Sequence, residues 1–275
     1  MAFHGSSFIF DGISCEEFHL MLYTFGDKGQ SDAQLVTREL FEDRVARSYV
    51  PLYYGSSFNR PLEFDLVFGQ NPKLIDQHTE LNRWDMEAIS AWLTGPEGYR
   101  DLVIVQEDLE AVHFKSIISD LQQISLGGET WALSCKVRCD SPYGYLSERV
   151  FTYEVVNQLN EAVLYNRSSH CGYYYPKVKI TLPDPMYRGD RERISIVNET
   201  DGGREFLLDI PNEAPQASEI IIDGQRGVIE NDAKRNLYDC FNYNFFRLLR
   251  GKNIIHFSGR FTADIICEFP VNVGG

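Results

Sequence analysis

Large apolar residues that alternate with smaller or polar ones restrict the fold of this chain more than any other feature of its sequence. Two long stretches show this alternation, one at residues 62–68 and one at residues 131–137. Successive side chains of a β-strand point to opposite faces of the sheet, so both stretches are predicted to be strands with one buried face. The residues of the expected buried faces are Leu62, Phe64, Leu66 and Phe68, and Trp131, Leu133, Cys135 and Val137.

Shorter stretches with the same spacing recur after residue 175. Turn-forming clusters such as Pro183-Asp184-Pro185 and Asp223-Gly224 separate them. Short strands punctuated in this way are typical of an antiparallel β-sandwich. The apolar residues concerned are Val178, Ile180, Leu182, Ile194, Ile196, Phe206, Leu208, Ile210, Ile220, Ile222, Ile265, Cys267 and Phe269.

One segment is instead typical of an amphipathic helix. Asn82 can cap its first turn, with Asp85 at the third position, and Gly95-Pro96 ends it. Trp92 flanks the apolar face and is expected to anchor the helix against a sheet. The residues that share the apolar face are Met86, Ile89 and Leu93.

The chain is therefore expected to be mainly β, with two domains. The first half combines strands with the one helix, whereas the second half is nearly all strand. The 15 Tyr and 18 Phe, against 4 Met, agree with a sheet-rich protein. Pro142 and Gly144 interrupt the alternation, so we expect domains at residues 1–145 and 146–275.

The charge of the chain is acidic and unevenly distributed. Residues 1–145 hold 11 Lys and Arg against 22 Asp and Glu, a net charge of −11, out of −14 for the whole chain. An acidic surface repels phosphate groups, so specific nucleic-acid binding is not expected. Excess acidic residues also keep a protein soluble, and this simpler explanation suffices for the charge by itself.

No motif of a catalytic, metal or cofactor site occurs in the sequence. His113 and His256 each stand alone on an expected strand, where they are expected to be sheet-face residues and not ligands or bases. Glu107, Asp108 and Glu110 lie between two expected strands and are interpreted as a solvated hairpin tip. The sequence therefore predicts that the protein is not an enzyme, needs no cofactor, and has no catalytic, metal-binding or carbohydrate-binding residues.

The six cysteines are expected to be free thiols without metal. They are scattered, and the single close pair, Cys135 and Cys139, has a spacing that places both thiols on one face of a strand. The N-terminus lacks a basic region before an apolar run, and no stretch reaches the roughly 20 apolar residues of a membrane span. Neither a secretory signal nor membrane insertion is expected.

Short motifs along the whole chain occur in a characteristic order. The motifs in the first half are FIFDGISCEEFHL at 8–20, PLEFDLVFG at 61–69, ISAWLTG at 89–95 and CDSPYGY at 139–145. Those in the second half are, in order, GYYYPKVKIT, ISIVNETDGGREFLLDI, EIIIDGQRGVIE and LLRGKNII. Through the order of these motifs, more than through any single one, the chain resembles the distal tail protein (Dit) family of bacteriophages with long, non-contractile tails.

The resemblance implies a structural virion protein. Six copies are expected to form a ring through a first domain related to the tail-tube fold, with a galectin-like second domain outside. The implied partners are the tail-tube protein, a tail-tip or baseplate protein, and receptor-binding proteins, at the distal end of a tail assembled in the host cytoplasm. The implied channel carries DNA, and the acidic first half is expected to repel it. The alternatives are a carbohydrate-binding or receptor-binding tail module, or an enzyme for which no paired catalytic groups can be placed.

The resemblance also suggests a role for the tetrad Arg250-Gly251-Lys252-Asn253. In the family this segment is a hairpin that returns a late strand to its sheet, and Gly251 and Asn253 are residues that tolerate positive φ. The alternative is a basic, anion-binding tip formed by Arg247, Arg250 and Lys252. Tyr173–Tyr175 offer aromatic rings for a saccharide, but tyrosines next to a strand are commonly core or edge residues.

Overall fold

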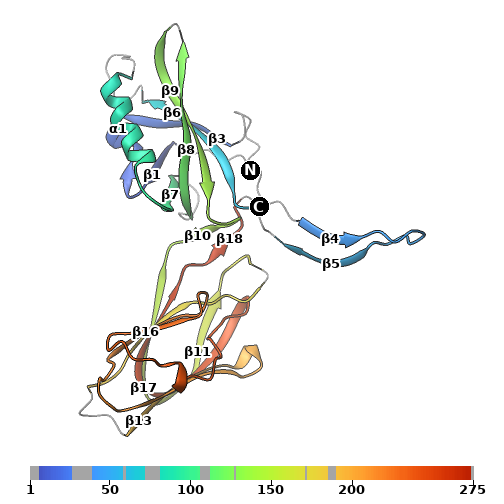
Figure 1. Ribbon diagram of the computed structural model, residues 1–275, viewed down its shortest axis with the longest axis vertical. Helices are drawn as coiled ribbons and strands as arrows, with labels where there is room; N and C mark the ends of the chain where they lie inside the picture. Colours follow the sequence, from blue (N-terminus) through green and yellow to red (C-terminus); the bar gives the residue numbers. More distant parts are fainter. Residues whose placement is uncertain are drawn as a thin grey trace. The chain divides into compact units, whose positions relative to one another are not determined.

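The chain divides into two compact units (Figure 1). One comprises Met1–Leu146 together with Asn272–Gly275, and the other comprises Ser147–Val271. The end of the chain thus belongs to the first unit, and not to the second domain as expected, because Val273 packs against the core of the first unit. The computed structural model describes residues 6–26, 39–57, 60–71, 81–105, 112–126, 128–170, 172–184 and 190–273.

A curled antiparallel sheet forms the framework of the first unit (Figure 1). Its strands follow the order β2-β1-β7-β8-β9-β6-β3, and β10 pairs with β8. The amide of Leu22 on β3 donates to the carbonyl of Ser6 at 3.0 Å, so the last strand of this path returns to the start of β1. The strands are β1 (Ser7–Phe10), β2 (Ile13–Ser14), β3 (Leu20–Gly26), β6 (Glu63–Gln70), β7 (Arg100–Val105), β8 (Val112–Leu126), β9 (Glu129–Cys139) and β10 (Gly144–Leu146).

The two long strands predicted from alternation are β6 and β9, which pair with each other. On β6 the buried residues are Leu66 and Phe68, while Phe64 is half-buried. On β9 the expected face is buried from Leu133 onward, and Trp131 is half-buried near the start of the strand. The prediction is confirmed because one face of each strand lies in the core of the unit.

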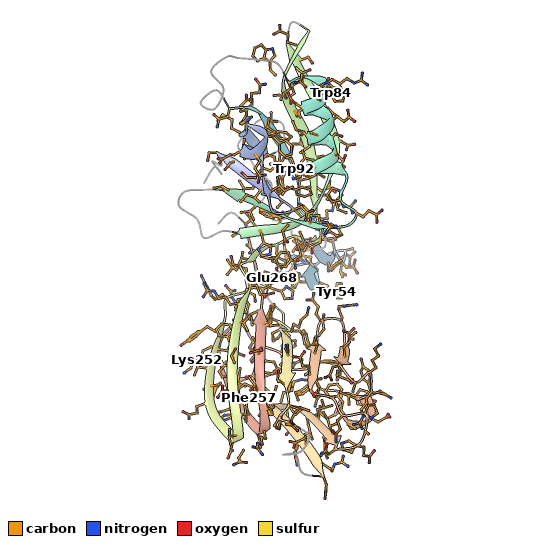
Figure 2. All side chains as sticks on the ribbon, turned by 90° about the vertical axis from the view of Figure 1, so that its left-hand side faces the viewer. Tyr54, Trp84, Trp92, Lys252, Phe257 and Glu268 are labelled. Atoms are coloured by element: carbon orange, nitrogen blue, oxygen red, sulfur yellow. The ribbon has the colours of Figure 1, made fainter. Side chains whose placement is uncertain are left out.

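The predicted helix is α1 (Arg83–Thr94). The side chain of Asn82 accepts hydrogen bonds from the amides of Trp84 and Asp85, and the Asp85 carboxylate accepts one from the Asn82 amide in return. This reciprocal cap begins the helix as predicted. Trp92 lies between the helix and the sheet (Figure 2), where its indole N–H donates to the carbonyl of Phe10 at 3.0 Å. Its ring also stacks on Phe18, with centroids 4.8 Å apart.

The second unit is an antiparallel β-sandwich in which β17 takes part in both layers. The first part of β17 pairs with β13 and the last part with β12. The corner between them is Gly259, whose φ of +132° and closeness to the carbonyl of Arg193 exclude a side chain. The strands of the sandwich are β11 (Arg149–Asn166), β12 (Lys177–Thr181), β13 (Arg191–Asn198), β14 (Arg204–Pro211), β15 (Glu219–Asp223), β16 (Val228–Asn231) and β17 (Gly251–Cys267). The short strand β18 (Pro270–Val271) is not one of them.

The core of the second unit consists of the apolar residues whose spacing predicted strands. All thirteen of them are buried, from Val178 on β12 to Phe269 after β17. Side chains at every second position of each strand thus meet between the two layers. No helix in the described part of the chain is long and apolar enough to cross a membrane.

Candidate interaction surfaces

The Arg250-Gly251-Lys252-Asn253 tetrad turns the chain, but it does not connect two strands. Strand β17 begins at Gly251, and the preceding residues 243–250 form an irregular segment with an isolated bridge between Leu248 and Tyr174. The hairpin prediction is therefore wrong, because the segment before β17 crosses the unit as a loop. The φ of Gly251 is +88°, as predicted, whereas Asn253 is not among the residues with positive φ.

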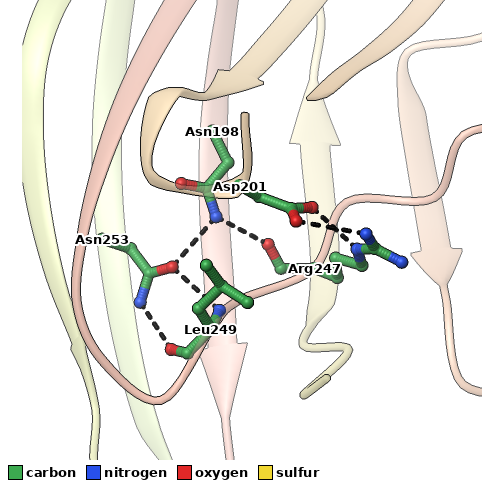
Figure 3. Close-up of polar contacts among 5 residues, drawn as sticks. All are labelled: Asn198, Asp201, Arg247, Leu249 and Asn253. Atoms are coloured by element: carbon green, nitrogen blue, oxygen red, sulfur yellow. Dashed lines mark hydrogen bonds and ion pairs between the residues drawn. The ribbon is translucent and has the colours of Figure 1, made fainter. Parts of the chain in front are cut away.

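Asn253 is instead a buried polar residue that holds this loop in place (Figure 3). Its side-chain oxygen accepts hydrogen bonds from the amide of Leu249 and from Asn198, both at 2.9 Å. Its side-chain nitrogen donates to the carbonyls of Leu249 and Gly251 at 2.8 and 3.0 Å. Asn198 also donates to the carbonyl of Arg247 at 2.9 Å. Two amide side chains thus satisfy backbone groups that the loop leaves without strand partners.

Arg247 is held by a carboxylate and an aromatic ring, which weakens the case for an anion-binding tip. Its guanidinium donates two hydrogen bonds to Asp201, at 2.7 and 3.1 Å (Figure 3), and lies 3.4 Å from the centroid of the Tyr173 ring. The Asp201 hydrogen bond raises the pKa of Arg247 above its ordinary value. The charge of Arg247 is therefore compensated, and only Arg250 and Lys252 of the suggested basic residues remain exposed.

Tyr173, Tyr174 and Tyr175 do not form a shared aromatic platform. The Tyr174 hydroxyl accepts from the Glu268 amide at 2.8 Å, and burial raises the pKa of Tyr174. Tyr175 is half-buried, whereas Tyr173 is 46% exposed. Since Arg247 already covers a face of the Tyr173 ring, the geometry gives a saccharide little room to stack there.

The two histidines predicted to lie on strands do so, His113 on β8 and His256 on β17. The His256 ring lies 2.8 Å from the Glu199 carboxylate. In the described part of the chain no three His, Cys, Asp or Glu side chains are grouped so that they could hold a metal ion. The expected acidic hairpin tip at Glu107–Glu110 lies outside the described residues.

The thiols of the described cysteines are free. Cys135 and Cys139 are both buried on β9, and burial raises the pKa of each thiol to about 12. A thiol with this pKa carries almost no thiolate near neutral pH and is unreactive. The expected common face of the two residues is thus part of the core. Cys171 lies outside the described residues.

Sequence reasoning did not identify the most exposed apolar surface of the first unit. Strands β4 (Glu39–Asp43) and β5 (Leu52–Ser57) form a separate hairpin, which pairs with no other described strand (Figure 1). Tyr49 is fully exposed, at 103%. The sequence does indicate this surface in the segment YVPLYY at 49–54, where apolar residues are consecutive and do not alternate with polar ones. The exposed apolar residues of this hairpin, here called the apolar hairpin, are Leu40, Phe41, Val45, Tyr49, Val50, Leu52, Tyr53 and Tyr54.

Two sheet-rich units with a large exposed apolar element are typical of a protein that works by assembling with other subunits. The chain belongs to a phage tail protein family. The family model described as "Phage tail protein N-terminal domain" matches residues 3–141, and the model described as "Phage tail C-terminal domain" matches residues 143–267. The protein is thus a structural component of a phage tail.

The fold is similar to those of two solved tail proteins. The Dit (gp 19.1) protein of phage SPP1, described as a paradigm of the hub adsorption apparatus in phages that infect Gram-positive bacteria, aligns with a TM-score of 0.65 at 8% identity, over 96% of this chain and 98% of that chain. A chain of the phage P2 baseplate in its activated conformation with Ca aligns with a TM-score of 0.52 at 10% identity, over the same shares. No curated protein sequence matches the chain. The fold is therefore Dit-like, which confirms the resemblance found in the sequence.

Proposed function

We propose that this protein is a distal tail adaptor. Six copies form a ring through the first unit, which joins the tail tube to the tail-tip or baseplate proteins and leaves a channel for DNA. The second unit is a galectin-like domain outside the ring that offers attachment to receptor-binding proteins. The observation that carries this proposal is the apolar hairpin, and the Dit-like fold supports it.

The apolar hairpin needs a partner surface. A two-stranded hairpin is only marginally stable alone in water, and this one pairs with no other strand of the described chain. Burying one large apolar side chain contributes about 1.5–3 kcal/mol, so eight of them supply on the order of 10 kcal/mol or more, comparable with the cost of association. Contact with a second copy of the chain would stabilise the unpaired hairpin and would also bury its exposed apolar side chains.

A hairpin that packs on its neighbour favours a ring. The hairpin and the surface that it covers on the next copy are different surfaces, so the contact is head-to-tail. Head-to-tail contacts close into a ring when the rotation between successive copies divides a full turn. Six copies is the number that the Dit resemblance implies.

The charge of the first unit suits a DNA channel. Six copies of residues 1–145 bring about −66 elementary charges to the ring, which repels phosphate groups and lets DNA pass without binding. An electron-microscopy map of a finished tail is expected to show more acidic than basic side chains on the wall of the channel. A basic or uncharged wall contradicts the electrostatic part of this proposal and leaves the adaptor role standing.

The ring is tested by removing the apolar surface of the hairpin. The triple variant Tyr49→Ser, Val50→Ser and Tyr54→Ser is expected to fold normally, because these side chains are exposed, and to lose the six-fold ring at the distal end of tails. Electron microscopy of tails and the mass of the released assembly, six times 31.6 kDa for the wild type, are the measurements.

A matched control carries the same kinds of substitution on the second unit. Val163→Ser, Tyr165→Ser and Tyr243→Ser also remove exposed apolar side chains and are expected to leave the ring intact. A triple hairpin variant that still forms the ring contradicts the role of the hairpin. A wild-type chain that is monomeric in finished tails, away from the tube axis, contradicts the adaptor role itself.

A further inference from the structure

Strand β11 is the open edge of the second unit. It is 18 residues long and, in the described part of the chain, pairs only with β17. Alternate residues of an outermost strand direct their N–H and C=O groups away from the sheet. Figure 2 shows the yellow-green β11 at one side of the ribbon of this unit. The strand therefore presents a row of backbone groups that can pair with another strand.

The other two edges of the same sandwich are covered. On β14, the amide of Asn242 donates to the carbonyl of Leu207 at 3.1 Å, and the Asn242 side chain donates to the carbonyl of Glu205 at 2.9 Å. On β16, the Tyr238 hydroxyl accepts from the amide of Ile229 at 3.1 Å. The unit thus supplies caps for two edges, and β11 differs from both.

The first part of β11 also lacks the features that usually protect an edge strand. Residues Val150–Val156, sequence VFTYEVV, contain no proline, lysine or bulge, and they pair with β17 in an unbroken register. The irregularity of the strand comes later, between Leu159 and Ala162. β-Branched and aromatic residues favour further strand pairing. At seven residues, the open stretch is as long as an ordinary strand.

We propose that Val150–Val156 is a docking edge to which a different tail protein adds an extended strand. The backbone groups of the edge require an extended partner, because only a strand can meet alternate N–H and C=O groups along seven residues. The side chains define the rest of its chemistry. Val150 and Val156 are 54% and 71% exposed, and Glu154 lies between them on the same face. The partner strand carries apolar residues beside the valines and a basic residue beside Glu154.

A second copy of this chain fits the edge less well. Pairing two β11 strands about a two-fold axis at Tyr153 is the arrangement that uses the whole open stretch, and it brings two Glu154 carboxylates near each other. Such a contact also joins chains in pairs. The proposal does not depend on the ring, because β11 belongs to the second unit and the apolar hairpin to the first.

A designed peptide tests the edge in the full-length protein. The probe is acetyl-Thr-Val-Thr-Lys-Thr-Thr-Thr-Val-Thr-amide, which in antiparallel pairing sets valines beside Val150 and Val156 and lysine beside Glu154. At a free concentration of about ten times its Kd for the protein, the probe is expected to slow amide hydrogen exchange about tenfold at alternate residues of 150–156, and not elsewhere. A probe with proline at its centre is the control and is expected to protect nothing. Unchanged exchange at 150–156, or equal protection by the proline probe, overturns the proposal.

Exchanging the charges of residue 154 and of the probe residue beside it distinguishes specific strand pairing from nonspecific binding. Glu154→Lys replaces an exposed side chain, and the variant is expected to bind a probe with glutamate in place of lysine more tightly than the original probe. If the wild-type protein and the Glu154→Lys variant both bind the lysine probe more tightly than the glutamate probe, the predicted pairing is contradicted.

In finished tails, a photo-crosslinking residue at position 150 is expected to join this chain to a different tail protein. A crosslink only to another copy of the chain, or none, overturns the proposal. Neither result affects the test of the apolar hairpin, so the two proposals can fail separately.

Discussion

Asn253 is the residue on which the loop before β17 most depends. We expect Asn253→Ala to lower the free energy of unfolding by about 3 kcal/mol, because the amide and carbonyl of Leu249 lose their hydrogen bonds to Asn253 in a buried place, and the Asn198 side chain loses one of its two acceptors. Denaturant unfolding measures this change. Lys252→Ala, at an exposed neighbour, is the control and is expected to change stability by less than about 0.5 kcal/mol. Equal effects of the two substitutions contradict the role assigned to Asn253.

The buried thiols predict how stability responds to alkaline pH. Burial raises the pKa of Cys135, Cys139 and Cys267 to about 12, from an ordinary value of 9.0. Between these values the unfolded chain loses thiol protons that the folded chain retains, so stability is complete below about pH 9 and falls as the pH rises toward 12. Unfolding free energies measured from pH 8 to pH 11 are expected to decrease, and less steeply in Cys135→Ala. Maleimide labelling with mass analysis at pH 8 is expected to leave all three thiols unmodified, and rapid labelling contradicts their burial.

At the scale of elements, Trp92 fixes α1 to the sheet of the first unit. Trp92→Ala is expected to cost about 3–5 kcal/mol because it removes a buried aromatic ring, and Trp92→Phe about 1 kcal/mol because it removes mainly the hydrogen bond to Phe10. Thermal and denaturant unfolding measure both. Trp84 lies on the same helix but is 77% exposed, so Trp84→Ala is expected to have almost no effect. A large effect at Trp84 contradicts the assignment of the buried face.

The elements also show which parts of the fold could be predicted from residues close together in the sequence. The cap at Asn82 and the alternation in β6 depend on residues a few positions apart, and both were predictable. The partner of Asn253 was not, because Asn198 is 55 residues away and meets it only when β13 and β17 pair. The same is true of β11, because being an edge is a property of the whole sheet.

At the scale of the whole molecule, the two units suggest independent folding. We expect residues 147–271 expressed alone to fold as a soluble β-sandwich, because their core lies within the unit. Circular dichroism is expected to show strand structure and a single cooperative melting transition. A random-coil spectrum contradicts separate folding of the units. The full chain, unfolded under the same conditions, is the reference.

The sequence by itself determined the mainly β class, the buried face of most core strands and the position of the one described helix. These depend on the period of apolar residues and on caps, which act within a single element. Tertiary structure decided that Val273 joins the core of the first unit, that Asn253 is a buried hydrogen-bonding centre, and that β4 and β5 stand apart as an exposed hairpin. Whether an apolar side chain is buried, and whether a strand has a neighbour on each side, depends on segments far apart in the chain, because burial and strand pairing exist only after those segments meet.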